Sequence, residues 1–330
     1  MTKISKNIKL SVAITIAMGT AYAETGEDNP SIRPKEQSKS SDLYAQFLYW
    51  HAGETIDWAF ATQQQPGMFQ STYESLAFHW DPGFRVGIGY NMQHDGWDTQ
   101  ASFTWFQAGA TAHVEGTVTS YSLAARLSLL EPFNAAKASV NLHYNIFDFD
   151  LGRNFLLSKY FALRPSIGIK GGWINQLFHL YWKKYDAFGF INTYGKDRME
   201  NNFSGGGPKG GFTGRWCFGN LQKNTVSILG SFEAGYLWGR WSVQDHFIDN
   251  LNTSIRLNTS PRNFGALVLH SFLGLGWDFN LHSDQMHLSM QLGYEIEDWL
   301  NHLQIFTNIS GSQNNDLILQ GINFGVRLDF

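Results

Sequence analysis

The sequence contains a single cysteine, Cys217, in 330 residues. One thiol excludes an intrachain disulfide framework and a zinc site built from several cysteines. It could still cross-link two molecules, but a residue of an ordinary strand is the simpler interpretation. Disulfides and cysteine-rich metal sites therefore play no part in the predicted fold.

Charged residues are also scarce, at 16% of the chain, against about 25% in a typical soluble domain. The formal net charge of −4 argues against a nucleic-acid-binding protein, which usually presents a basic face. Apart from the amino end, no apolar run approaches the about 20 residues that a transmembrane helix needs. The chain is nevertheless 15% aromatic, and its mean hydropathy is only −0.25. This combination is typical of a transmembrane β-barrel, whose membrane signal is hidden in alternating side chains.

The amino end has the three parts of a secretory signal peptide. Positive residues precede a short apolar core at 10–18, and Ala21-Tyr22-Ala23 forms a small-residue cleavage site. This core is too short to cross a membrane, so we expect residues 1–23 to be removed. Residues 24–41 are polar and contain two prolines, which predicts a disordered periplasmic lead-in. The folded domain, an outer-membrane barrel, is then expected from residue 42 to residue 330.

The carboxyl-terminal segment, residues 320–330, alternates most clearly. Asn, Gly, Arg and Asp occupy one face, and the other face carries Ile322, Phe324, Val326, Leu328 and Phe330. Successive side chains of a strand point to opposite faces, so this segment has one apolar and one hydrophilic side. Its length is close to the about 10 residues that a tilted strand needs to cross a bilayer. The pattern predicts the closing strand of an outer-membrane barrel, with Phe330 as the carboxyl-terminal signal for assembly.

Similar segments recur along the chain and predict an all-β protein with one antiparallel transmembrane barrel. Counting back from Phe330, with long and short connections alternating, gives about twelve strands, within a range of ten to sixteen. An even number places both ends in the periplasm, as closure of a single chain requires. The predicted strands cover residues 43–50, 55–61, 84–90, 100–105, 120–129, 138–151, 161–173, 212–218, 227–238, 267–279, 288–297 and 320–330.

Two of these segments contain irregularities. Between 138 and 151 the apolar side chains change parity, from Val140–Ile146 to Phe147–Leu151. A slip of one residue would turn every later side chain to the wrong face, so we predict a β-bulge near Ile146 or Phe147. Pro165 lies inside another predicted strand, where it cannot donate a hydrogen bond, and a local bulge is the only account we offer.

The connections predict short periplasmic turns and long outer loops. Long polar connections are expected at 175–209, 239–263 and 297–319, and short ones at 154–159, 219–224 and 280–285. The connection at 92–96 would be an outer loop despite its short length. Tryptophans near strand ends predict aromatic girdles at the two membrane interfaces; they are Trp50, Trp80, Trp97, Trp105, Trp173, Trp216, Trp238, Trp277 and Trp299.

The hydrophilic face of the predicted strands should line the lumen. By alternation it includes Arg85, Arg126, Asp148, Asp150, Arg164, Lys170, Arg215, Glu233, Glu295, Glu297, Arg327 and Asp329. Charges around a water-filled pore determine which ions pass, but neither sign dominates here, so the selectivity stays open. The alternative is that these charges pair across a narrow lumen and close it, since small barrels fill with side chains.

No catalytic or metal-binding constellation stands out, and we expect neither an enzyme nor a cofactor. The eleven histidines show no ligand spacing and no HExxH motif. The glycine-rich stretch 205–211 lacks the ending of a phosphate-binding loop, so we expect a flexible loop there. A Ser-His-Asn arrangement, which outer-membrane phospholipases need, has no convincing candidate.

Several motifs resemble the Legionella-type major outer membrane protein family, which also occurs in environmental relatives of chlamydiae. They are the segments 47–50, 80–91, 94–98, 142–145, 150–155, 163–165 and 323–327. The resemblance covers about residues 43–330 and implies a pore-forming barrel, with attachment to host cells as a further role. It offers no catalytic residues, and with Cys217 alone a disulfide-linked envelope lattice is not expected.

The leading hypothesis is a porin-like pore in the bacterial outer membrane, through which ions and small hydrophilic solutes diffuse passively. The alternative is a surface adhesin or structural envelope barrel that acts through its outer loops. A third hypothesis, a soluble secreted β protein, would require the apolar faces to pack against one another. Expected partners are membrane lipid and lipopolysaccharide, the barrel assembly machinery, solutes and host-cell surfaces, but not nucleic acid. A homo-oligomer is compatible with this interpretation.

Overall fold

The computed structural model describes residues 40–65, 68–92, 96–128, 130–186, 188–218, 224–281, 286–307 and 311–330. The predicted signal peptide and nearly all of the predicted lead-in lie outside these residues. The first described strand begins at Ser40.

The described residues form fourteen strands and one short helix. They are β1 (Ser40–Gly53), β2 (Ile56–Gln65), β3 (Met68–Leu76), β4 (Trp80–Asn91), β5 (Trp97–Ser120), α1 (Leu123–Leu127), β6 (Phe133–Arg153), β7 (Phe155–Leu156), β8 (Phe161–Tyr185), β9 (Ile191–Phe218), β10 (Asn224–Asp249), β11 (Ser254–Asn258), β12 (Arg262–Leu281), β13 (Met286–Thr307) and β14 (Gly311–Asp329).

Antiparallel pairing closes ten of the fourteen strands described into a ring. The order is β1-β14-β13-β12-β10-β9-β8-β6-β5-β4, and β4 pairs with β1 again. The predicted number of about twelve is not confirmed, although ten lies within the predicted range of ten to sixteen, and two predicted strands account for the difference. The predicted strand 55–61 belongs to the β2–β3 hairpin outside the ring, and the predicted strand 120–129 contains α1 instead, with Ser122 as its N-cap.

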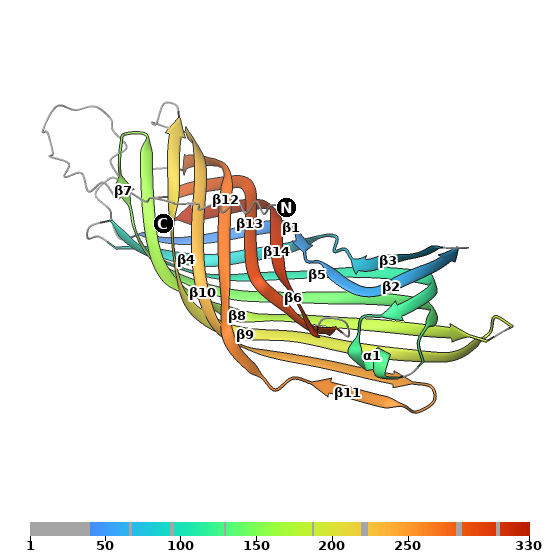
Figure 1. The fold of residues 1–330 in the computed structure, drawn as a ribbon. Helices are drawn as coiled ribbons and strands as arrows, with labels where there is room; N and C mark the ends of the chain where they lie inside the picture. The colour runs from blue at the N-terminus through green and yellow to red at the C-terminus, as the bar shows by residue number, and fades with distance from the viewer. Residues whose placement is uncertain are drawn as a thin grey trace, which may run out of the picture.

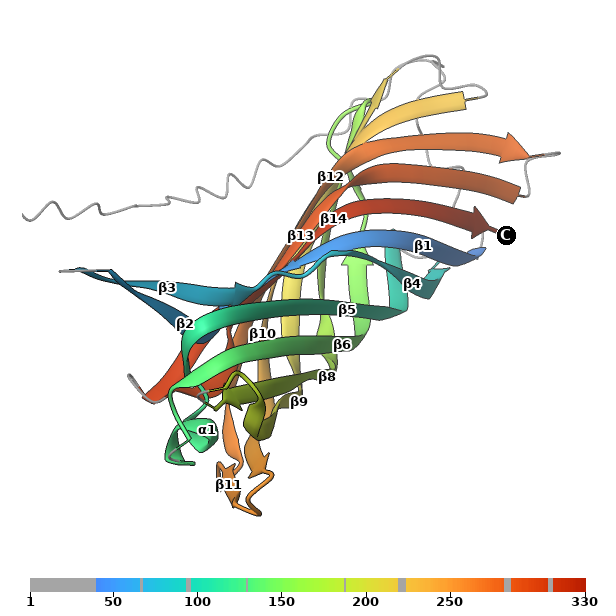
Figure 2. The same ribbon diagram turned by 90° about the vertical axis from the view of Figure 1, so that its right-hand side faces the viewer.

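Both ends of the ring lie on the same side, which we take as periplasmic. Ser41 and Phe330 exchange two backbone hydrogen bonds of 2.9 Å, and Figures 1 and 2 show the carboxyl terminus beside the start of β1. The hairpin β2–β3, α1 and β11 lie toward the opposite end. Asn91 of β4 and Trp97 of β5 lie at the end of the ring that carries the termini, so the connection between them was wrongly predicted as an outer loop; its residues 93–95 lie outside the described residues.

The strands are longer than a membrane crossing requires. β8 has 25 residues and β9 has 28, against about 10 for a tilted spanning strand. On β8 the outward apolar side chains run from Leu163 to Trp173; at about 3.3 Å per residue and a tilt of about 40° this belt is about 25 Å high. Beyond it the strands continue into an extension that we call the crown: β2, β3, α1, β11 and the adjoining outer ends of the ring strands.

The change of parity in β6 marks the passage from the membrane to the crown. Phe147 and Phe149 point outward and are exposed, whereas Val140, Leu142 and Ile146 are buried inside. Pairing with β5 and β8 runs without a register shift through this region, so the predicted bulge at Ile146 or Phe147 is wrong. No shift in strand register is needed to explain the change of parity, because apolar side chains face lipid in the belt and face the interior in the crown.

The same reversal explains why long loops were predicted. Residues 175–209, 239–263 and 297–319 are mostly strand, continuing β8, β9, β10, β12, β13 and β14. In these parts the outward side chains are polar, as in a soluble sheet with one solvated face. The crown interior is an apolar core that includes Trp58, Phe133, Phe178, Trp182, Trp241 and Phe247.

Local sequence anomalies have specific places in this fold. Pro165 lies in β8 between two ladders: pairing with β6 ends at Ser166, and pairing with β7 begins at Leu163. Its missing N–H therefore interrupts no strand pairing on the side of β6 and β7. The glycine-rich stretch 205–211, predicted as a flexible loop, lies within β9. A Cβ at Gly207 would come within 2.0 Å of the Tyr236 carbonyl oxygen, so the two strands approach closely there.

The tryptophans divide between surface and interior. Trp80, Trp173, Trp216 and Trp238 are exposed on the outer wall, whereas two of the predicted girdle residues, Trp50 and Trp299, are fully buried inside the barrel. None of the helices in the described part of the chain is both long enough and apolar enough to cross a bilayer.

Candidate functional site in the barrel interior

Paired charges fill the barrel interior at the level of the apolar belt. We call this set the charged layer; it comprises Arg85, Asp148, Asp150, Lys170, Lys209, Glu233, His270, Glu295 and Glu297. Alternation places these side chains inward because their neighbours along each strand, such as Phe149 and Ile169, face outward. Two residues of the layer, Lys209 and His270, were not among the predicted lumen charges.

Two lysines bind most of the carboxylates. Lys209 Nζ lies 2.9 Å from oxygens of both Asp148 and Asp150 and 3.1 Å from Glu233. Lys170 Nζ lies 3.4 Å from Asp148 and 3.3 Å from Glu297. Because Asp148 contacts both lysines, it joins their ion pairs into one network. Removing one partner from a buried pair leaves an uncompensated charge, which costs about 3–5 kcal/mol.

Arg85 forms a second cluster of paired side chains in the charged layer. Its guanidinium lies 3.1 Å from Glu295 and donates hydrogen bonds to Gln46 at 2.7 Å and Thr104 at 2.9 Å. Glu295 also lies 3.3 Å from His270. Arg85 thus connects β4 with β1, β5 and β13, and Glu295 extends these contacts to β12. The side chain of Glu295 is only 1% exposed.

The remaining predicted lumen charges form separate pairs nearer the periplasmic end. Arg164 pairs with Asp98, Arg215 with Asp278 at 3.1 Å, and Arg327 with Asp42 and Asp329, both at 2.8 Å. Arg126 is the exception, because it lies in the last turn of α1 and pairs with Glu131 at 3.0 Å. Its assignment to the pore wall is therefore incorrect, since the segment that carries it is not a barrel strand.

Aromatic residues cover the charged layer on the side of the crown. The Tyr144 hydroxyl donates to Glu297 at 2.5 Å, and the Trp299 indole N–H donates to the same carboxylate at 2.8 Å. Trp50 contacts Tyr144 and Phe106 with ring centroids 6.2 Å and 5.4 Å apart. We call Trp50, Phe106, Tyr144, Phe203, Trp241 and Trp299 the aromatic layer; all are at most 1% exposed.

The two layers together leave little water in the interior. Side-chain exposure is 7% for Lys170, 4% for Lys209 and 2% for Glu297. The wall of an open aqueous pore would be wetted by the solvent inside it, so such low exposure indicates a lumen that is closed at this level. This geometry matches the alternative considered from the sequence, in which the charges pair across a narrow lumen and close it.

Further ionisable groups are buried in the crown. Asp245 accepts hydrogen bonds from Ser122 Oγ at 3.1 Å and from the Ala124 N–H at 3.2 Å, which fixes the start of α1 against β10. Asp197 on β9 lies beside it; burial, and then the neighbouring Asp245, raise the pKa of Asp197 well above its usual value. Similarly, burial raises the pKa of Glu54, which lies 3.7 Å from His302.

These crown residues could not be found from the sequence. Asp197 and Asp245 lie in strand segments whose outward faces are polar, so a polar residue there carried no signal of burial, and Glu54 lies in the short connection between β1 and β2. Lys209 was missed because the surrounding glycines were interpreted as a loop. Among the described residues, no group of three His, Cys, Asp or Glu side chains could hold a metal ion.

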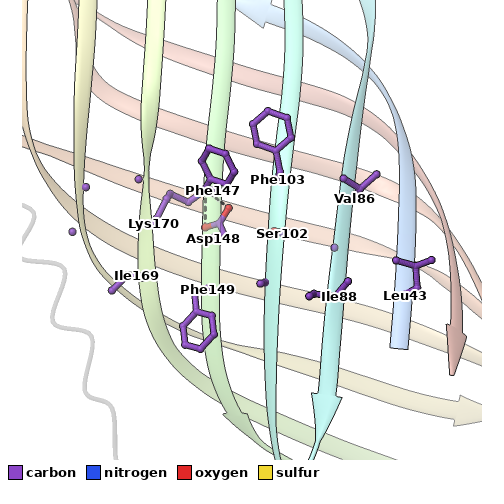
Figure 3. A pocket seen from close by; sticks show the side chains of 15 residues that line it. Leu43, Val86, Ile88, Ser102, Phe103, Phe147, Asp148, Phe149, Ile169 and Lys170 are labelled. Carbon is purple, nitrogen blue, oxygen red and sulfur yellow. Dashed lines mark hydrogen bonds and ion pairs between the residues drawn. The ribbon is translucent and has the colours of Figure 1, made fainter. Parts of the chain in front are cut away.

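The outer wall of the belt has an apolar hollow of about 820 Å³. Small residues such as Gly87, Ala101 and Gly206 form part of its lining, and larger apolar side chains surround it on neighbouring strands (Figure 3). Asp148 and Lys170 lie paired beside it. Because this surface belongs to the belt, we expect acyl chains of the membrane to fill it.

A closed antiparallel ring with an outward apolar belt and long outer extensions defines the protein as an outer-membrane β-barrel. The family described as Legionella pneumophila major outer membrane protein precursor matches residues 33–330. The chain belongs to this family, which confirms the resemblance found in the sequence. A search of curated proteins gave no match.

Comparison with solved structures gave matches of low sequence identity. The outer membrane protease OmpT from Escherichia coli is 10% identical, with 90% of this chain and 99% of that chain covered and a TM-score of 0.42. The Pseudomonas putida toluene transporter TodX is 9% identical, with 90% of each chain covered and a TM-score of 0.31. A Pseudomonas aeruginosa FadL homologue is 9% identical, with 88% of this chain and 90% of that chain covered and a TM-score of 0.30.

Proposed function

We propose that this protein is a closed outer-membrane barrel that acts at the cell surface through its crown, as a structural or adhesive protein. The observation that carries the proposal is the filled interior. The aromatic layer and the charged layer lie one above the other, and Trp50, Trp299 and Glu295 are at most 1% exposed. Passive diffusion of solutes, the hypothesis that the sequence favoured, would require both layers to separate.

The cost of separating the layers supports closure. An open lumen would expose the aromatic layer to water, and burying a large apolar side chain contributes about 1.5–3 kcal/mol. It would also break the contacts of Glu297 with Lys170, Tyr144 and Trp299. These contacts join β6, β8 and β13 across the interior, so opening would have to displace several strands together.

The far end of the crown supports a contact role. The turn between β8 and β9 exposes Phe188 and Phe190, whose relative exposures are 85% and 73%. Leu251, in the connection between β10 and β11, is exposed as well. Exposed apolar clusters on a folded protein often mark contact sites for other molecules. We assign the contact surface of the protein to these outer turns, in place of the long loops expected from the sequence.

Conductance of the purified protein in planar bilayers tests closure. The folded protein should insert without discrete current steps under conditions in which an open porin, used as the positive control, conducts. Regular current steps of uniform size from the wild-type protein would overturn the proposal and favour a diffusion pore. Insertion is checked separately, by protease protection of the protein in the same vesicles.

A variant of the outer turn tests the contact role. We expect Phe188→Ser/Phe190→Ser to reduce attachment of protein-coated beads to cultured cells severalfold, because it removes the exposed apolar surface. The matched control Leu156→Ser/Leu157→Ser removes two exposed apolar residues at the periplasmic end and should leave attachment unchanged. If the wild type and the outer-turn variant attach equally, the proposal of adhesion through this turn is wrong.

A further inference from the structure

A cluster of four lysine and arginine side chains and two histidines on the outer wall of the crown has no role in the closed-barrel proposal. Two adjacent rows of paired residues cross β6, β8, β9, β10 and β11. One row places His179, Arg198, His246 and Arg256 side by side, and the next contains Lys137 and Lys196. We call these six residues the cationic groove, because most of them line a hollow of about 370 Å³.

Among the described residues, Arg198 is the one member of the groove whose charge is paired with a carboxylate. Asp197 and Asp245 belong to the same strands but point inward and are buried. Within the two described rows no carboxylate faces outward; Glu200, 2.8 Å from Arg198, lies in the next outward-facing row, two residue pairs closer to the membrane. Arg256 Nε donates to His246 Nε2 at 3.2 Å. Burial, and then the positive charges of Arg256 and Arg198, lower the pKa of His246.

The height of the groove indicates what it meets. His179 follows the outward-facing Trp173 by six residues on β8. At about 3.3 Å per residue and a tilt of about 40°, the groove begins about 15 Å above the aromatic edge of the belt. In the outer leaflet of a Gram-negative outer membrane this level contains the phosphorylated and carboxylated inner sugars of lipopolysaccharide. The groove opens sideways from the barrel wall, toward neighbouring lipids.

The size and composition of the groove suit the same ligand. Small-molecule sites typically measure about 300–1,000 Å³, and the groove is large enough for a phosphorylated sugar. Lysine and arginine side chains form strong charge-assisted hydrogen bonds with phosphate and carboxylate oxygens. Tyr181 and Ile248 line the hollow between the cations and offer apolar contact to a sugar ring.

We propose that the cationic groove binds the anionic inner-core sugars of a lipopolysaccharide molecule from the surrounding outer leaflet. The bound molecule would hold the crown upright beside the membrane and connect it to the lipopolysaccharide layer. This site does not depend on whether the lumen conducts, so its failure and the failure of the closed-barrel proposal can be told apart.

Binding to defined lipopolysaccharides tests the site. The full protein in nanodiscs of zwitterionic lipid is titrated with lipopolysaccharide truncated to its inner core, with lipid A alone, with heparin and with inorganic phosphate. We expect inner-core lipopolysaccharide to bind most tightly. Lys196→Gln/Arg198→Gln should weaken this binding at least about tenfold, since two charge-assisted contacts are lost. Raising the salt concentration to about 0.5 M should weaken wild-type binding as well.

The control removes two positive charges outside the groove. Lys159→Gln/Arg262→Gln changes exposed residues near the periplasmic end and at the start of β12, and it should bind like the wild type. Heat-dependent migration on gels verifies that both variants fold. Unchanged binding in the groove variant, an equal loss in the control, equal affinity for lipid A alone, or tighter binding of heparin would each overturn the proposal.

Discussion

At the scale of single residues, the ionisable side chains in the belt were easier to predict than those in the crown. Eleven of the twelve predicted lumen charges lie on ring strands, where an outward apolar neighbour leaves the polar residue only the inward direction. The prediction for Arg126 was wrong because its segment contains a helix. Asp197 and Asp245 were missed because strand alternation alone does not distinguish a buried carboxylate from a solvated one once the outer face is polar.

Asp197 gives the crown a predicted pH dependence. Burial and Asp245 raise the pKa of Asp197 in the folded state, so the folded protein holds this proton more tightly than the unfolded chain. The stability from this group is fully present below its unfolded pKa of about 3.9 and is lost as pH rises through the folded value. Asn has nearly the same shape and no charge, so Asp197→Asn should be more stable than wild type at pH 8.

Thermal unfolding in detergent micelles measures this difference. The melting temperature of Asp197→Asn should exceed that of wild type by at least about 2 °C at pH 8, and the difference should shrink toward zero near pH 4. A difference that is the same at both pH values, or that grows as the pH falls, would contradict a retained proton on Asp197.

At the scale of elements, the sequence predicted the membrane part of each strand and misjudged its continuation. The predicted strand 161–173 is the belt part of β8, which runs on to Tyr185. The continuation was interpreted as a loop because the apolar parity reverses and polar residues face outward. In β6 the same reversal was interpreted as a bulge. Alternation reports which face is apolar, but it does not report which solvent that face meets.

The glycine-rich part of β9 should tolerate substitution unevenly. A Cβ at Gly207 would come within 2.0 Å of the Tyr236 carbonyl oxygen, whereas at Gly210 the nearest atom is 3.6 Å away. Backbone atoms of a paired strand cannot move aside as a side-chain end can. We expect Gly207→Ala to lower the free energy of unfolding by about 1–3 kcal/mol and Gly210→Ala to change it by less than about 0.5 kcal/mol.

Urea unfolding in lipid vesicles, followed by tryptophan fluorescence, compares the two glycine variants. Equal stabilities of Gly207→Ala and Gly210→Ala would show that β9 and β10 do not approach as closely as the structure indicates. The comparison is internal to one strand, so differences in membrane insertion affect both variants alike.

At the scale of the whole molecule, the class of fold followed from the sequence but the interior did not. Alternation, the scarcity of charge and the terminal Phe330 together predicted an outer-membrane barrel, and the family match and the closed ring agree with this class. Whether the lumen is open depends on how far side chains such as Trp299 and Arg85 reach across it, and on ring size. The residue pattern of a single strand indicates neither the reach of these side chains nor the number of strands in the ring.

The strands leave the membrane with their apolar faces turned inward, around a solid crown. Cysteine accessibility in intact vesicles tests this arrangement most directly, with Cys217 replaced by Ser and single cysteines placed at Leu142, His143 and Phe149. A membrane-impermeant maleimide should modify the cysteine at His143 and neither of the others, and a lipid-soluble reagent should reach the one at Phe149. Leu142→Cys should react only after unfolding. If it reacts with the impermeant reagent as fast as His143→Cys, the interior is wet and the account of a closed barrel is wrong.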